Sequence, residues 1–278
     1  MAYAPPAMRI RNFFRYPSAD LVTLSPVIDS PVDSALAALG VCPSRAVLRT
    51  TDSRRTIAVI GFPRSGNTYL TSWLQWLARP EITVLDGRLT HSALDLHRLA
   101  KDEACVVVPI REPLATCASL LVRWDEHLEL GTARAVLRAY RGWYVSARRT
   151  YMASRPGTIV LAGFEEFTTQ PQCVTNWPCV WSMLDHSRLG TATEFEARLQ
   201  VQLDQEEGQG LPLDGIPGNQ MISLPDPKRV PLLEQASELL QRPELARHLA
   251  RAERAYTRLA TLAYPLSRTP SAMESPGK

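Results

Sequence analysis

The segment G-F-P-R-S-G-N-T, residues 61–68, has the residue types and the spacing of a glycine-rich phosphate loop. In nucleoside triphosphatases the pattern G-x-x-x-x-G-K-[ST] holds phosphates on backbone N–H groups, and its lysine reaches the outer phosphates. Asn67 stands at the lysine position in this chain, and the positive charge lies three positions earlier, at Arg64. The segment therefore predicts a bound phosphate whose counter-charge comes from Arg64.

A second positive charge follows an apolar run further along the chain. The run A-C-V-V-V-P-I, residues 104–110, ends at Arg111, followed by Glu112 and Pro113. A triphosphatase normally carries an aspartate at the end of such a strand, where it holds magnesium. An arginine at the carboxyl end of a parallel strand instead suits a second phosphate on the same nucleotide.

Strands and helices alternate around these residues. Apolar runs rich in β-branched residues predict strands over 56–62, 104–110 and 158–162. Apolar residues at helical spacing predict helices over 68–78, 113–130, 133–153, 170–186 and 231–263, with a loop over 208–231. This order predicts an α/β fold with a parallel sheet flanked by helices, in which the first helix aims its positive end at the phosphate loop.

Length and composition limit the classes of protein. A chain of 278 residues suits a single domain, which we expect over 53–266, after a partly ordered arm (1–52) and before a flexible tail (267–278). A formal net charge of +3 does not predict nucleic-acid binding, and no segment is apolar enough for a membrane span. The five cysteines include no C-x-x-C pair, so we expect neither a disulfide framework nor a zinc site, and a cytoplasmic protein.

These residues resemble the sulfotransferases that use 3′-phosphoadenosine 5′-phosphosulfate (PAPS). The segment P-R-S-G-N-T-Y-L, residues 63–70, is similar to the family's loop P-[KR]-S-G-[TN]-[ST], which binds the 5′-phosphosulfate. Ser119 follows Arg111 at the family's interval of eight residues. The pair Thr90 and His91 resembles the T-H pair of the cytosolic members, and F-E-E-F, residues 164–167, looks like their Y-E-D segment. The resemblance implies a P-loop-like sulfotransferase fold.

The resemblance also implies a role for each residue. Arg64 would stabilise the sulfuryl group, His91 would be the catalytic base, and Arg111 with Ser119 would hold the 3′-phosphate. The remaining residues expected to bind the nucleotide are Ser65, Gly66, Asn67, Thr68, Tyr69, Phe164, Lys228 and Arg229. Tyr69 would either stack on adenine or pack against the sheet. The product would be adenosine 3′,5′-bisphosphate, and no metal is required.

The acceptor and two other functions stay open at this point. The acceptor would be a hydroxyl or an amine of a small molecule or carbohydrate, and His97 competes with His91 as the base. One alternative is a P-loop kinase in which Arg64 replaces the lysine and Glu165 or Glu166 holds magnesium. The other is a nucleotide-binding module without catalysis.

Overall fold

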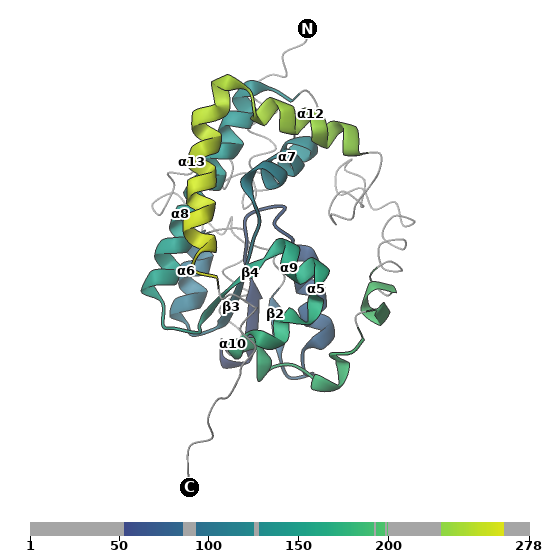
Figure 1. Ribbon diagram of the computed structural model, residues 1–278. Coiled ribbons are helices and arrows are strands. Elements are labelled where there is room, and N and C mark those ends of the chain that lie inside the picture. Colours follow the sequence, from purple (N-terminus) through teal and green to yellow (C-terminus); the bar gives the residue numbers. More distant parts are fainter. Residues whose placement is uncertain are drawn as a thin grey trace, which may run out of the picture.

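A computed structural model gives the fold (Figure 1). It describes residues 53–263 except for gaps at 86–92, 125–127, 192, 198 and 200–228. The expected amino-terminal arm, the expected tail, His91, Lys228 and nearly all of the expected loop at 208–231 lie outside the described residues. The expected boundaries of the domain therefore stay predictions.

The described strands form one parallel sheet. The strands are β1 (Thr56–Val59), β2 (Thr83–Leu85), β3 (Cys105–Ile110) and β4 (Ile159–Gly163), and their order is β2-β1-β3-β4. Every neighbouring pair in that order is parallel. After β1 the chain adds β2 on one side and then crosses to the other side for β3, so the direction of winding reverses between β1 and β3. In open parallel sheets, ligands bind at such a reversal, beside the carboxyl ends of the strands.

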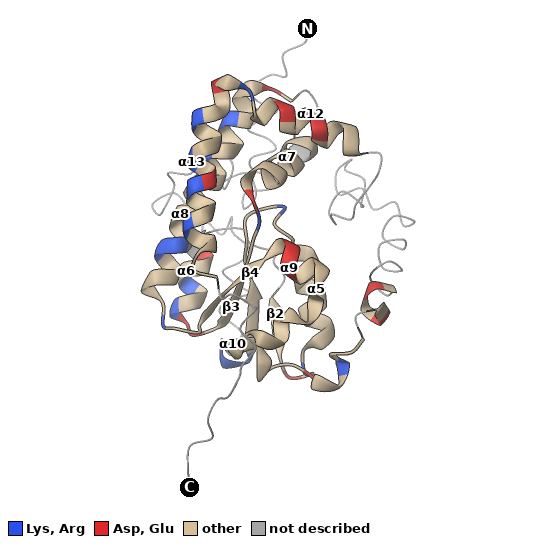
Figure 2. Cartoon of the chain, in the orientation of Figure 1, with Lys and Arg blue, Asp and Glu red and all other residues tan. Residues whose placement is uncertain are grey.

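Helices cover both faces of the sheet. One face carries α5 (Asn67–Leu77) and the short elements η2 (Pro171–Asn176) and α10 (Pro178–Trp181). The other face carries α6 (Ala93–Lys101), α7 (Pro113–Trp124), α8 (Leu130–Ala153), α12 (Val230–Leu240) and α13 (Pro243–Ala260). The remaining helical turns are η1 (Ser53–Arg55), α9 (Phe164–Thr169) and η3 (His186–Arg188). Figure 2 shows that Lys and Arg residues (blue) recur along α8 and α13.

The apolar residues of the central strands alternate between two clusters. Ile57 and Val59 pack with α5, whereas Ala58 and Ile60 pack with the helices of the opposite face. Successive side chains of a strand point to opposite faces, so a strand buried on both sides needs a continuous apolar run. Residues 57–60 supply this apolar run, and all four are at most 1% exposed.

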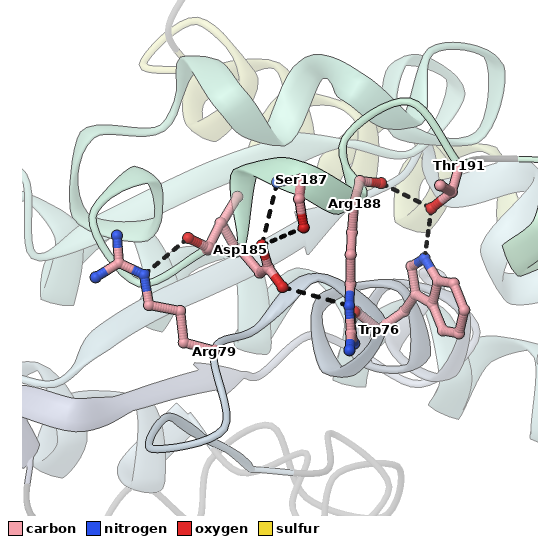
Figure 3. Close-up of polar contacts among 7 residues, drawn as sticks. Trp76, Arg79, Asp185, Ser187, Arg188 and Thr191 are labelled. Atoms are coloured by element: carbon pink, nitrogen blue, oxygen red, sulfur yellow. Dashed lines mark hydrogen bonds and ion pairs between the residues drawn. The ribbon is translucent and has the colours of Figure 1, made fainter.

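The carboxyl end of α5 is fixed by a polar network that is separate from the sheet (Figure 3). Arg188 Nη1 donates to the carbonyl oxygen of Trp76 at 2.9 Å, and Trp76 Nε1 donates to Thr191 Oγ1 at 2.8 Å. Arg79 Nε donates to the carbonyl oxygen of Leu184 at 3.0 Å. The network joins α5 to residues more than 100 positions away and holds the helix whose other end carries the glycine loop.

The expected strands are present, although β1 ends at Val59 rather than at 62, and several helices differ from the sequence prediction. β2 and α6 were not predicted, and α7 ends at Trp124 rather than at 130. The helix expected over 170–186 is instead η2, α10 and η3, because Pro171 and Pro178 each start a new turn. The stretch 231–263 contains two helices that are separated at Gln241 and Arg242, just before Pro243.

The structure contains a disulfide that the cysteine pattern did not predict. Cys105, at the start of β3, is bonded to Cys179 in α10, 74 residues later. Cys117 and Cys173 are free and buried. The bond ties the central strand to the short helices on the α5 face. Separately, none of the described helices has the length and apolar character needed to cross a bilayer.

Candidate functional site

The glycine loop connects β1 to α5 at the reversal point of the sheet. Gly66 has φ +92°, in the left-handed region that residues with a Cβ rarely adopt. A Cβ at Gly66 would lie 2.7 Å from Phe167 Cζ and 2.8 Å from Phe164 Cδ2. Glycine is therefore required here both by the backbone and by two aromatic rings that press against the turn.

Ser65 and Asn67 hold the loop from inside. Ser65 Oγ donates to the carbonyl oxygen of Phe62 at 2.6 Å, and Asn67 Nδ2 donates to the same oxygen at 2.9 Å. Asn67 Nδ2 also lies 3.4 Å from the carbonyl oxygen of Gly61. Both side chains are buried, with exposed fractions of 0% for Ser65 and 4% for Asn67. The asparagine at the usual lysine position thus braces the loop, and its side chain points away from solvent.

The backbone at the start of α5 offers hydrogen-bond donors. The first bond of the helix runs from the N–H of Leu70 to the carbonyl oxygen of Gly66 at 3.0 Å. The N–H groups of Asn67, Thr68 and Tyr69 precede that bond, and no side chain caps the helix. Free N–H groups and the positive end of the helix dipole together make this turn suited to an anion.

Arg64 meets the second predicted motif directly. Its Nε donates to Ser119 Oγ at 2.9 Å, and its carbonyl oxygen accepts from Arg111 Nη1 at 3.2 Å. Arg64 and Ser119 are 8% and 7% exposed. Arg64 also has φ +68°, a left-handed conformation that costs a non-glycine residue about 1–2 kcal/mol. The structure therefore brings together the three residues that were predicted from two separate motifs.

Arg111 is held at the carboxyl end of β3 by two tyrosines of α8. The Tyr144 hydroxyl accepts from the N–H of Arg111 at 2.9 Å and donates to its carbonyl oxygen at 2.9 Å. The Tyr140 hydroxyl donates to the same carbonyl oxygen. Burial is the largest cause that raises the pKa of both tyrosines above the usual value for tyrosine. Both hydroxyls therefore remain protonated donors near neutral pH.

The guanidinium of Arg111 lies between an aromatic ring and the glycine loop. Its Cζ is 3.9 Å from the centroid of the Phe164 ring, a cation–π contact. Its Nε is buried and has no hydrogen-bond partner. Burial lowers the pKa of Arg111, and the negative charges of Glu165 and Glu112 oppose that effect. Phe164 thus contacts the predicted cation, and the arginine keeps one buried donor available.

Tyr69 is half-buried and packs against the apolar cluster on the α5 face. Its ring centroid lies 6.2 Å from that of Phe167 and 5.6 Å from that of Phe195. Burial is the largest cause that raises the pKa of Tyr69 to about 12. Of the two expected roles, packing near the sheet is the one that these contacts describe.

The other predicted residues lie on other elements of the described chain. Arg229 immediately precedes α12. Glu165 and Glu166, named for the kinase alternative, lie in the first turn of α9. Burial raises the pKa of Glu166. His97 is exposed on α6. No group of three or more described His, Cys, Asp or Glu side chains is arranged to hold a metal ion.

Tyr140 and Tyr144 are site residues that the sequence prediction missed. Their spacing of four residues on one helix places both side chains on one face, which the sequence does indicate. The sequence does not indicate which strand end that face covers, because the contact joins residues about 30 positions apart.

Comparison with known proteins gives no relative. No family model, no curated protein and no solved structure matches the chain. The site is therefore interpreted from its own residues: a glycine loop, an open helix start and two arginines at the reversal point of a parallel sheet.

Proposed function

We propose that the chain is a sulfotransferase that moves a sulfuryl group from PAPS to a hydroxyl or amine of a small molecule or carbohydrate. The observation that carries this proposal is the convergence of Arg64, Ser119 and Arg111 beside the start of α5. Two arginines that lie at the same loop suit a ligand that carries two separate anionic groups.

The residues around the glycine loop fit such a nucleotide. The first turn of α5 offers N–H groups for the 5′-phosphate, and the buried Nε of Arg111 is a donor that lacks a partner. Ser119 lies next to Arg64 and supplies a hydroxyl beside that guanidinium. When bound, PAPS would supply a sulfuryl group on a phosphate leaving group, and the proposed site needs positive charge around both.

Each residue of the chain has one task in this proposal. The N–H groups of α5 orient the 5′-phosphate, and Arg111 with Ser119 holds the 3′-phosphate. Arg64 balances the negative charge that develops on the sulfuryl oxygens and on the departing phosphate oxygen. The bond from sulfur to the phosphate oxygen breaks as the bond from sulfur to the acceptor forms. The acceptor proton passes to His91, which the family resemblance suggests as the base and which lies outside the described residues.

Mass spectrometry of acceptors tests the proposal. The protein is incubated with PAPS and a panel that contains a phenol, an aliphatic alcohol, a sugar and an amine, with and without a magnesium chelator. We expect one acceptor to gain the mass of a sulfuryl group in both conditions. A phosphoryl mass gained from ATP, and lost on chelation, would show a kinase instead.

Two variants separate the proposed roles. His91→Ala is expected to bind adenosine 3′,5′-bisphosphate normally and to lower turnover by about 10²–10⁴-fold, the usual contribution of a general base. Arg64→Ala is expected to lower both turnover and nucleotide affinity, because its charge lies beside the nucleotide throughout. Arg155→Ala is the control, since Arg155 is exposed and pairs with Glu103 away from the glycine loop. Wild-type turnover in Arg64→Ala would refute the assignment.

A further inference from the structure

Two neighbouring helices carry a second group of arginines. On α8 these arginines recur at spacings of four and three residues, and on α13 they recur at the same spacings. Residues at these spacings share one side of a helix. The set consists of Arg134, Arg138 and Arg141 on α8 and Arg247, Arg251 and Arg254 on α13. Figure 2 shows the two helices side by side, with Lys and Arg residues (blue) along both.

A hollow lies between the two helices. Its volume is about 220 Å³, and its lining residues are Leu137, Arg138, Arg141, His248 and Arg251. Leu137 is fully buried and forms an apolar floor, whereas the four basic side chains surround it. The hollow is smaller than the roughly 300–1,000 Å³ of a pocket for a drug-sized ligand. Its size therefore favours a compact group over a sugar chain or a nucleotide.

The positive charge of this hollow is not neutralised by the described protein. Arg98, Arg155 and Arg188 each pair with a carboxylate. Within the described ranges, no ion pair joins any arginine of the hollow to an acidic side chain. Like charges at this spacing on a helix are destabilising. A bound anion would remove this repulsion.

The charged groups around His248 are also positive. Burial is the largest cause that lowers the pKa of His248, and Arg134, Arg251, Arg138 and Arg247 lower it further. Arg141 and Arg254 act in the same direction on the pKa of Arg251. Every charged neighbour that shifts the pKa of these two groups is therefore an arginine, contributed by both helices.

We propose that the hollow between α8 and α13 is a binding site for a compact, soluble molecule that carries phosphate groups. Three guanidinium groups offer planar pairs of N–H donors that match phosphate oxygens. The site is separate from the candidate site at the glycine loop, because Tyr140 and Tyr144 of α8 are buried toward Arg111 whereas Arg138 and Arg141 are exposed. It does not depend on the proposed sulfotransferase activity.

Titration with inorganic pyrophosphate tests this site. The full chain is first saturated with adenosine 3′,5′-bisphosphate, so that the candidate site at the glycine loop is filled. Pyrophosphate binding is then measured by calorimetry. The His248 ring signals, assigned with His248→Gln, give a local reading by NMR. We expect one pyrophosphate to bind per chain, and we expect binding to raise the pKa of His248, because a negative neighbour favours the protonated ring.

Matched double variants identify the residues. Arg138→Gln with Arg251→Gln removes two charges from the hollow, whereas Arg149→Gln with Arg258→Gln removes two exposed charges from the same helices outside it. The first pair is expected to weaken pyrophosphate binding at least tenfold, on the order of the loss of one charge-assisted hydrogen bond. The second pair is expected to leave binding within about twofold of the wild type.

The proposal is overturned by any of three results. The first is no shift of the His248 signals with pyrophosphate, and the second is equal weakening in the two double variants. The third is binding to vesicles that contain phosphatidic acid without binding of pyrophosphate, which would show a membrane-binding surface. Thermal unfolding of each variant without ligand checks that the fold is intact.

Discussion

Truncation of Arg111 to alanine is expected to weaken the binding of adenosine 3′,5′-bisphosphate by about 10- to 150-fold. A hydrogen bond to a charged group contributes about 1.5–3 kcal/mol, and each 1.4 kcal/mol is a factor of ten in affinity. The tyrosines of α8 hold only the backbone of Arg111, and an alanine keeps those bonds. The variant therefore removes the cation without releasing the strand end.

The expected thermal shift follows from mass action. Ligand at 100 times its Kd stabilises the folded state by about 2.7 kcal/mol, which raises the Tm of a domain of this size by about 5–11 °C. If the Kd of the variant is about 30-fold weaker, the same concentration gives about 0.9 kcal/mol and a shift of about 2–3 °C. Differential scanning fluorimetry resolves these two shifts.

The comparison must be made between shifts and not between absolute melting temperatures. Without ligand, Arg111→Ala also loses the bond to the carbonyl oxygen of Arg64 and the contact with Phe164, together about 1–3 kcal/mol. Arg155→Ala controls for the loss of one positive charge. A full shift in Arg111→Ala, or equal shifts of the wild type with adenosine 5′-phosphate and the bisphosphate, would refute the assignment of Arg111 to the 3′-phosphate.

Three further predictions concern the loop and its support. Gly66→Ala is expected to lower the free energy of unfolding, measured in urea, by about 2–4 kcal/mol, because alanine must adopt a left-handed conformation and displace two aromatic rings. Unchanged stability would contradict the described turn. Arg64→Ala and Ser119→Ala are expected to show a coupling of about 0.5–1.5 kcal/mol in a double-mutant cycle of unfolding, because both substitutions remove the same hydrogen bond. Strictly additive effects would argue against that hydrogen bond. Hydrogen bonds from the side chain and, to a smaller extent, the backbone of Ser187 lower the pKa of Asp185. The ionised carboxylate therefore stabilises the fold above the unfolded pKa of 3.8, and this stabilisation is lost as pH falls through the pKa of the folded state. Asp185→Asn should therefore be less stable than the wild type at neutral pH, and this difference should narrow at pH values of about 3; a difference independent of pH would exclude the ionised carboxylate as the cause.

The central strands could be predicted from sequence because both of their faces are buried. β1 and β3 need continuous apolar runs, and such runs are visible without any knowledge of the fold. β2 has only three residues and is half-buried or exposed at the edge of the sheet. A short edge strand has no characteristic pattern, so only its pairing with β1 identifies it.

The helix breaks were present in the sequence, whereas the disulfide was not. Pro171, Pro178 and Pro243 each stand at the start of a helical element, where proline is favoured. Their positions would have divided the two helices that were predicted as continuous. The bond between Cys105 and Cys179 depends on α10 reaching the start of β3, which no local pattern indicates.

Within the candidate site, the sequence predicted which residues meet but not how each one is used. The interval between Arg111 and Ser119 placed both beside the glycine loop, and the contact with Arg64 agrees. Asn67 was expected to offer a donor to the ligand, yet its amide binds the carbonyl oxygens of the loop. The direction of a short polar side chain depends on which backbone groups are left without a partner nearby, and that is known only once the turn is built.

The unpredicted strand β2 gives the strongest support for the location of the site. Without β2, β1 would be the edge of the sheet, and no reversal of winding would exist beside the glycine loop. With β2 in place, the reversal falls between β1 and β3, whose following residues are the loop and Arg111. This argument uses only the backbone, and is independent of any resemblance to a family. A ligand at that edge of the sheet would lie beside Arg64, Arg111 and the positive end of α5, so it should be anionic even if no sulfuryl group is transferred.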